Sequence, residues 1–237
     1  MRGFSKARTP KPGSWRQPAR ASAVEGVSED GWHTTNTVDY VLMINAELPA
    51  KSVREFIAYG KSNPGKLNYA SAGVGSATHL SMAYFASLAG VDMVHIPFKG
   101  TNEAVQEVLT GRSHAVMAST IGALPFAKDA RVRMLGVSGS TRSRFAPDLP
   151  TIAESGLEGY AFDSWIGILG PAGMPKATVD QINAAMATLL KDAGVLDRLA
   201  KQGVEPRALT PEAFAKLLDE DFVRMGRVVK AAGARID

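Results

Sequence analysis

From Val38 onward, short apolar segments rich in β-branched residues alternate with segments of helical period, and this alternation most constrains the fold. The expected strands cover residues 38–44, 67–70, 92–98, 115–118 and 132–137. Linkers of a few residues join each strand to a helix, so the strands are expected to run parallel, with helices covering the sheet. The sequence therefore predicts an α/β fold.

Local signals place several helix ends. Ser52-Val53-Arg54-Glu55 is a capping box, so a helix is expected from there to about Asn63, where Pro64-Gly65 ends it. A second helix covers about 77–89 and another follows Lys99-Gly100-Thr101-Asn102. Thr210-Pro211-Glu212 is a helix start with proline in the first turn, and it opens the last helix.

The regular alternation of expected strands and helices ends after Gly139. Residues 140–150 are loop-like, and residues 160–169 are expected to form one long apolar strand that passes between two lobes. Two helices, over 176–192 and 194–202, are expected next.

The charge of the chain is concentrated at its beginning. The 237 residues hold 27 Lys and Arg against 23 Asp and Glu, for a net charge of +4. Six of the basic residues lie within the first 20, which hold no acid, so the remainder has 21 basic and 23 acidic residues. Residues 1–37 are expected to be a disordered extension without function. Nucleic-acid binding through this extension is an alternative, but the acidic remainder opposes it.

Composition excludes several classes of site. Cysteine is absent, which excludes disulfides, thiol catalysis and zinc–thiolate centres. No run of about 18 apolar residues occurs, so we expect no direct membrane insertion. The four histidines have no i,i+4 pairing, which argues against a metal site. We expect neither metal nor cofactor.

Three expected strands each end in a polar loop that contains or leads to glycine and then enters a helix. Because carboxyl ends of parallel strands share one edge, these loops should meet there. Helix starts carry unpaired N–H groups and partial positive charge, which suit a carboxylate or phosphate. The ordinary alternative is that each loop is only a helix cap. The candidate residues in these loops are Gly75, Ser76, Thr78 and His79, then Lys99, Gly100 and Thr101, then Ser119.

Catalytic motifs are incomplete. Gly136-Val137-Ser138-Gly139-Ser140 is near a nucleophile elbow but has serine where the last glycine belongs. His95 alternates with apolar neighbours and is interpreted as a structural histidine. No carboxylate pair stands out as acid and base. An α/β enzyme using Lys99 or His79 as acid–base remains an alternative, although no partner group is placed to orient either residue.

Several segments in register resemble the Bug/TctC family, the extracytoplasmic solute receptors of tripartite tricarboxylate transporters. The resemblance runs in order from about Val41 to Asp237 and is strongest at Ser164-Trp165-Ile166-Gly167. Its other segments are Leu48-Pro49-Ala50-Lys51-Ser52-Val53, residues 63–73, Gly75, His79, residues 94–100, residues 149–157, Gly159-Tyr160 and residues 171–176.

The resemblance implies a two-lobed periplasmic binding protein of type II-like fold, with parallel-rich sheets covered by helices, that closes on its ligand by a hinge. It implies a small carboxylate ligand, transporter membrane subunits as partners, a periplasmic location, and neither catalysis nor a cofactor. The loop residues named above would bind the ligand, and Trp165 would lie near the hinge or cleft wall. From the residues alone, core packing of Trp165 is the equal alternative.

The chain also departs from the family pattern. Family members begin with a signal peptide and a first-lobe segment that holds a Pro-Gly-Gly loop and an Asn-Arg-Pro-Gly-Ala-Gly-Gly stretch. Neither stretch precedes Val38, and no apolar signal core is recognisable. We therefore expect an incomplete first lobe from residues 38–47 and 160–237, and a second lobe from residues 48–159.

Overall fold

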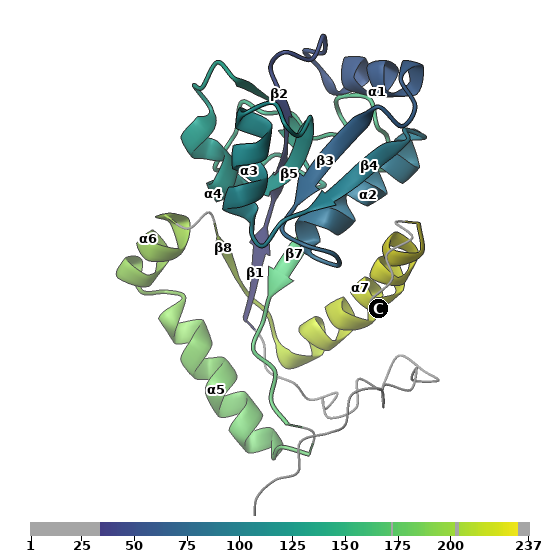
Figure 1. Ribbon diagram of the computed structural model, residues 1–237. Helices are drawn as coiled ribbons and strands as arrows, with labels where there is room; N and C mark the ends of the chain where they lie inside the picture. The colour runs from purple at the N-terminus through teal and green to yellow at the C-terminus, as the bar shows by residue number, and fades with distance from the viewer. Residues whose placement is uncertain (1–33, 172, 202–203, 232–237) are drawn as a thin grey trace, which may run out of the picture.

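The computed structural model describes residues 34–171, 173–201 and 204–231. Figure 1 labels its helices and strands. In chain order they are β1 (Thr34–Val38), β2 (Tyr40–Asn45), α1 (Val53–Ser62), β3 (Leu67–Ser71), α2 (Ala77–Ala89), β4 (Met93–Pro97), α3 (Thr101–Leu109), β5 (Ala115–Ser119), α4 (Thr120–Ala123), a 3-10 turn (Leu124–Phe126), β6 (Val132–Val137), β7 (Ser164–Ile166), α5 (Lys176–Leu189), α6 (Ala193–Lys201), β8 (Glu205–Ala208) and α7 (Pro211–Ala231).

A five-stranded sheet with the order β4-β3-β5-β2-β6 forms the larger unit. Strand β3 is parallel to β4 and β5, whereas β2 is antiparallel to β5 and β6. Strands β3, β4, β5 and β6 therefore all run in one direction, as predicted, and the expectation of an all-parallel sheet is wrong for β2. The chain enters β2 directly from the other sheet at Asp39, so no βαβ crossover sets the direction of this strand.

The two faces of this sheet are covered by different helices. Alternate strand residues such as Leu42 and Met117 pack with Phe56 of α1 and Phe85 of α2. The intervening residues, such as Val116, form a second cluster with α3. All six residues of β2 are buried, because helices lie on both sides of it.

A smaller sheet with the order β7-β1-β8 connects to the C-terminal helices, and both neighbours of β1 are antiparallel to it. In Figure 1, β1 and β7 leave the lower edge of the five-stranded sheet, and α7 lies below α2. The contacts confirm that α7 packs against α2: Val228 belongs to the core cluster that α2 shares, and the partly buried Met225 packs against that cluster.

The prediction of one long strand over residues 160–169 is wrong, because β7 covers three residues, Ser164–Ile166. Before it, the Phe162 amide donates to the carbonyl of Ser138 (2.8 Å), and Ser138 Oγ donates to the carbonyl of Phe162 (2.6 Å). These bonds hold the segment against the loop after β6. Strand β8 was not expected, since Glu205, Pro206 and Arg207 give no strand signal; it lies at the sheet edge, where proline is tolerated.

The expected boundaries near the beginning also need correction. Residues 34–37, assigned to the extension, belong to β1, and residues 40–45, assigned to the first lobe, form β2 in the five-stranded sheet. The rest of the expected extension, residues 1–33, lies outside the described residues. Within the described ranges, no helix is both long and apolar enough to cross a membrane.

Candidate functional site at the carboxyl edge

Strands β3, β4, β5 and β6 all end at one edge of the sheet, which we call the carboxyl edge; the opposite edge is the amino edge. The three predicted loops follow β3, β4 and β5, so the fold brings them together. Glycine positions show how close they are. A Cβ atom built on Gly73 would lie 3.4 Å from the carbonyl oxygen of Phe98, and one on Gly122 would lie 3.2 Å from Ser119 Oγ and 3.5 Å from Thr101 Cγ2.

The loop after β3 is closed by its own hydroxyl groups. Ser76 is the N-cap of α2: its Oγ accepts from the amide of His79 (3.2 Å) and donates to the carbonyl of Gly73 (2.7 Å). Thr78 Oγ1 accepts from the amide of Ala72 (2.8 Å). These hydroxyls are therefore engaged within the loop, as the cap alternative expects. The amides of Ala77 and Thr78 have no acceptor among the described residues, so they remain available to an anion.

His79 is turned back onto this loop. The amide of Gly75 donates to His79 Nδ1 (3.1 Å), and the imidazole is buried. Its ring stacks on that of His95 with centroids 3.9 Å apart. Burial lowers the pKa of His79, and burial together with the neighbouring His79 lowers the pKa of His95 to about 4. Both rings are therefore neutral at pH 7.

The loop after β4 offers main-chain donors. Gly100 is the N-cap of α3 and provides no side chain to bond the first turn, so the amides of Thr101 and Asn102 point out of the helix start. Lys99 is exposed, and its own amide donates to Glu103 Oε2 (3.1 Å). Its ammonium group supplies a positive charge at this rim, and the Glu103 carboxylate offsets part of it.

The loop after β5 leaves one hydroxyl free. Both the amide and Oγ1 of Thr120 donate to the carbonyl of Asp39, each at 2.9 Å. Ser119 Oγ, by contrast, makes no hydrogen bond to any described residue, although Ser119 occupies the N-cap position of α4. The Ser119 hydroxyl is therefore available to a ligand at the carboxyl edge.

The sequence analysis missed two carboxylates at this edge. A Cβ built on Gly139, in the loop after β6, would lie 3.1 Å from Asp163 Oδ1 and 3.2 Å from Asp39 Oδ1. We call Asp39, Gly139 and Asp163 the acidic corner. Burial raises the pKa of both carboxyl groups. Asp39 lies between β1 and β2, and Asp163 immediately precedes β7, so each is at a point where the chain passes between the two sheets. The only sequence signal was that Asp39 interrupts an apolar run and Asp163 precedes another.

The acidic corner also limits where an anion can bind. Two carboxylates repel a third, so a bound carboxylate is expected at the loops after β3, β4 and β5 rather than beside Gly139.

Trp165 contacts the C-terminal helix α7. Its Nε1 donates to Asp221 Oδ2 of α7 (2.9 Å), and its ring meets that of Phe214 edge to face with centroids 5.1 Å apart. Trp165 belongs to β7 of the smaller sheet, so its observed contacts are those of the packing alternative.

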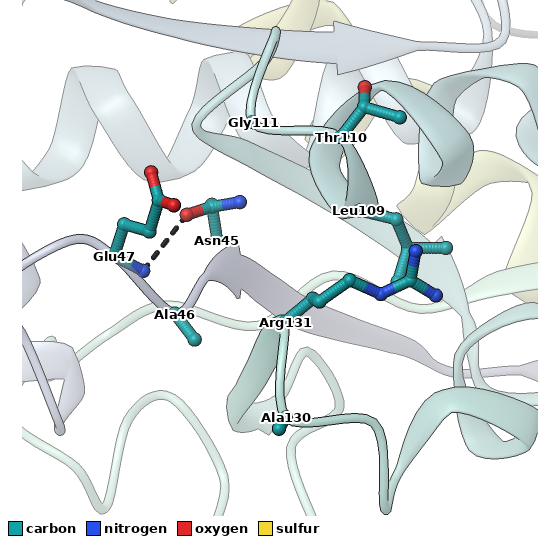
Figure 2. Close-up of a pocket in the computed structure, with 8 residues that line it drawn as sticks. All are labelled: Asn45, Ala46, Glu47, Leu109, Thr110, Gly111, Ala130 and Arg131. Atoms are coloured by element: carbon teal, nitrogen blue, oxygen red, sulfur yellow. Dashed lines mark hydrogen bonds between the residues drawn. The ribbon is translucent and has the colours of Figure 1, made fainter.

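A hollow of about 330 Å³ lies at the amino edge (Figure 2). It is lined by the end of β2 at Asn45, by Glu47, by the Leu109–Gly111 turn and by Arg131. Arg131 is paired with Asp129 (2.6 Å), and Asn45 is held by Glu47 and Val108. None of the predicted binding residues lines it, so this hollow is not the candidate site.

The geometry weakens the enzyme alternative. His79 Nδ1 is occupied by the Gly75 amide, which removes it as a base in this conformation. Lys99 is exposed, and no described side chain orients its ammonium group. The nucleic-acid alternative depends on residues that lie outside the described part of the chain.

Two solved structures that contain a dicarboxylate are similar to this chain in fold and in sequence. The Rhodopseudomonas palustris protein Rpa4515, solved with adipate, is 29% identical with a TM-score of 0.75, over 85% of this chain and 67% of that one. MatC from the same species, with bound malate, is 31% identical with a TM-score of 0.71, over 82% and 67%.

The family follows from the sequence match. The model of the tripartite tricarboxylate transporter family receptor, TctC, matches residues 30–234, so the chain belongs to this family. A protein from the tcbD-tcbE intergenic region of Pseudomonas sp. strain P51 is 31% identical over 81% of this chain. The match covers 58% of that relative, so the chain spans little more than half its length.

Proposed function

We propose that this chain is the receptor, or part of the receptor, that captures a small carboxylate in the periplasm for the membrane subunits of a tripartite tricarboxylate transporter. The observation that carries the proposal is the meeting of three loops at the carboxyl edge. The loops there contain the amides at the starts of α2 and α3, the Ser119 hydroxyl and the exposed Lys99, which are the donors that we assign to the ligand. Adipate and malate in the two solved relatives support a dicarboxylate as the ligand class.

In this proposal the ligand carboxylate accepts hydrogen bonds from main-chain N–H groups, and Ser119 and Lys99 add one side-chain donor each. Gly75 and Gly100 carry no side chain, so the ligand can approach the backbone closely. The lobe that closes over it comes from the elements around the smaller sheet. The hinge of that movement lies at the two crossings, next to Asp39 and Asp163.

Isothermal titration calorimetry with adipate and malate, together with thermal shift, tests this proposal. A ligand that binds only the folded state raises the melting temperature, and the effect grows with concentration. Hydrogen bonds to charged groups contribute about 1.5–3 kcal/mol, so Ser119→Ala should weaken binding by roughly 10-fold or more. Lys99→Ala should weaken it and reduce its dependence on salt.

Lys66→Ala is the matched control, because Lys66 is an exposed lysine that precedes β3 at the amino edge. Its substitution should leave binding unchanged. Equal losses for Lys66→Ala and Lys99→Ala would show a nonspecific charge effect, and the absence of binding by any dicarboxylate would contradict the proposal.

A further inference from the structure

Two stacked imidazoles lie directly beneath the loop after β3. His79 comes from the first turn of α2, and His95 comes from the middle of β4. The rings are nearly parallel, at 11°, and Tyr69 of β3 lies beside both, with its ring centroid 4.9 Å from that of His95 and 6.3 Å from that of His79. These mutual ring contacts restrict the orientation of both histidines, because each imidazole contacts the other one and Tyr69.

Each imidazole is also bonded to the loop. His79 Nδ1 accepts from the amide of Gly75 (3.1 Å). His95 Nε2 lies 2.6 Å from Ser71 Oγ, and that hydroxyl in turn accepts from the amide of Gly73 (3.1 Å). Gly73 and Gly75 both have positive φ, at 118° and 77°, so the loop has a backbone conformation that side-chain-bearing residues rarely adopt. The two histidines therefore stabilise the backbone conformation of this loop through their bonds to Gly75 and Ser71.

The bonding pattern fixes the protonation of His79. A ring nitrogen that accepts from a backbone amide carries no proton, so in the neutral ring the proton is on Nε2. A proton added at Nδ1 would face the Gly75 N–H and break that bond. His79 therefore holds the loop only in its neutral form.

We propose that His79 and His95 are a pair of positioning residues for carboxylate capture, which as neutral stacked rings keep the Ser71–Ser76 segment in the conformation that presents the Ala77 and Thr78 amides. The inference rests on the proposed function and deepens it. His79 acts through Gly75 rather than as a cationic contact of the ligand.

The surroundings of the pair favour the neutral state. Burial lowers the pKa of both histidines, and a charge on either ring opposes a charge on the other. Tyr69 is the titratable group that faces them from β3, and burial raises its pKa to about 12, so it stays uncharged. On the neighbouring loop, Lys99 and Glu103 carry opposite charges. On α7, which packs against α2, Arg224 is engaged by Asp221 and by the carbonyl of Asp163.

The proposal predicts an unusual pH dependence for an anion site. Binding of adipate should weaken as the pH is lowered below the ordinary histidine pKa of about 6.5, because protonation of His79 releases Gly75. A cationic histidine in contact with the ligand would give the opposite sign. Variants are compared at the same pH, so the protonation of adipate itself is identical in each comparison.

Calorimetry on two variants separates these cases. In His79→Asn the amide oxygen can accept from Gly75 and does not titrate, so affinity at pH 8 should stay within about threefold of the parent and its pH dependence should flatten. His79→Phe keeps a ring in the stack without an acceptor, and should lose about tenfold or more at pH 8. His114→Asn is the control, because His114 is a half-buried histidine at the amino edge whose pKa burial also lowers. It should leave the profile unchanged.

Nuclear magnetic resonance of the free protein provides a readout that needs no ligand. Long-range ¹H–¹⁵N spectra should show the Nε2–H tautomer for His79, and the Gly75 amide shift should follow the His79 titration. An Nδ1–H tautomer, or affinity that rises at low pH and is flattened by His79→Asn, would overturn the proposal. If no dicarboxylate binds at any pH, the proposed function fails, while the Gly75 shift still decides whether His79 holds the loop.

Discussion

Ser76 and Ser119 occupy equivalent positions, each at the N-cap of the helix that follows a parallel strand, yet they differ in what their hydroxyls do. Ser76 Oγ bonds the first turn of α2 and the loop before it. Ser119 Oγ makes no bond to a described residue. The first serine is therefore structural, and the second is free to meet a ligand.

Substitution by alanine should separate these roles. Ser76→Ala should lower the free energy of unfolding by about 1 kcal/mol, the usual cost of an N-cap, as measured by urea denaturation. Ser119→Ala should leave it within about 0.5 kcal/mol of the parent, since no described hydrogen bond is lost. A large destabilisation by Ser119→Ala would show that its hydroxyl has a structural partner.

Asp39 provides a second prediction for a single residue. Burial raises its pKa, and Asp163 and Glu205 add repulsion in the same region. A carboxyl group with a raised pKa binds its proton more tightly in the folded state, so its contribution to stability is greatest at low pH and is lost as the pH rises through the folded pKa. Asp39→Asn should therefore raise the melting temperature at pH 7 and have less effect near pH 4. An equal shift at both pH values would exclude this electrostatic origin.

Among the elements, those with local signals were predicted well from the sequence. Helix α2 covers Ala77–Ala89 as expected, because a serine cap begins it and Gly90, with φ of 63°, ends it. Strands β3 to β6 agree within a residue or two. The direction of β2 and the edge strand β8 were not predictable, because both depend on pairing with distant segments rather than on local pattern.

The candidate site shows the same division. The loops after β3, β4 and β5 could be predicted, since each follows a strand and opens a helix. The acidic corner could not, because Asp39 and Asp163 are 124 residues apart in sequence and converge only around Gly139. The position of the His79 side chain, stacked on His95 and bonded to Gly75, could not be predicted either, because it depends on a residue of strand β4.

Packing of α2 gives a prediction for this element. Phe85 is fully buried between Phe56 and Tyr160, so Phe85→Ala should cost about 3–5 kcal/mol of unfolding free energy. Leu88 of the same helix is 43% exposed, and Leu88→Ala should cost far less. Similar losses for both variants in urea denaturation would contradict the assignment of the buried face.

For the whole molecule, the connection between the two sheets is the feature that matters for function. The chain crosses from β1 to β2 at Asp39 and returns toward β7 at Asp163. Arg224 of α7 donates to the carbonyl of Asp163 (2.9 Å) and pairs with Asp221, and Asp221 accepts the indole N–H of Trp165. Helix α7 is thereby attached to one of the two crossings.

This chain of bonds makes Trp165 an internal optical probe. After Trp15 and Trp32 are replaced by phenylalanine, all indole emission comes from a ring that is bonded, through Asp221 and Arg224, to the crossing at Asp163. Saturating adipate should then shift the wavelength or intensity of that emission, even though the ligand is bound elsewhere. Arg224→Lys, which cannot form the same fork of bonds, should weaken the optical response more than it weakens adipate affinity.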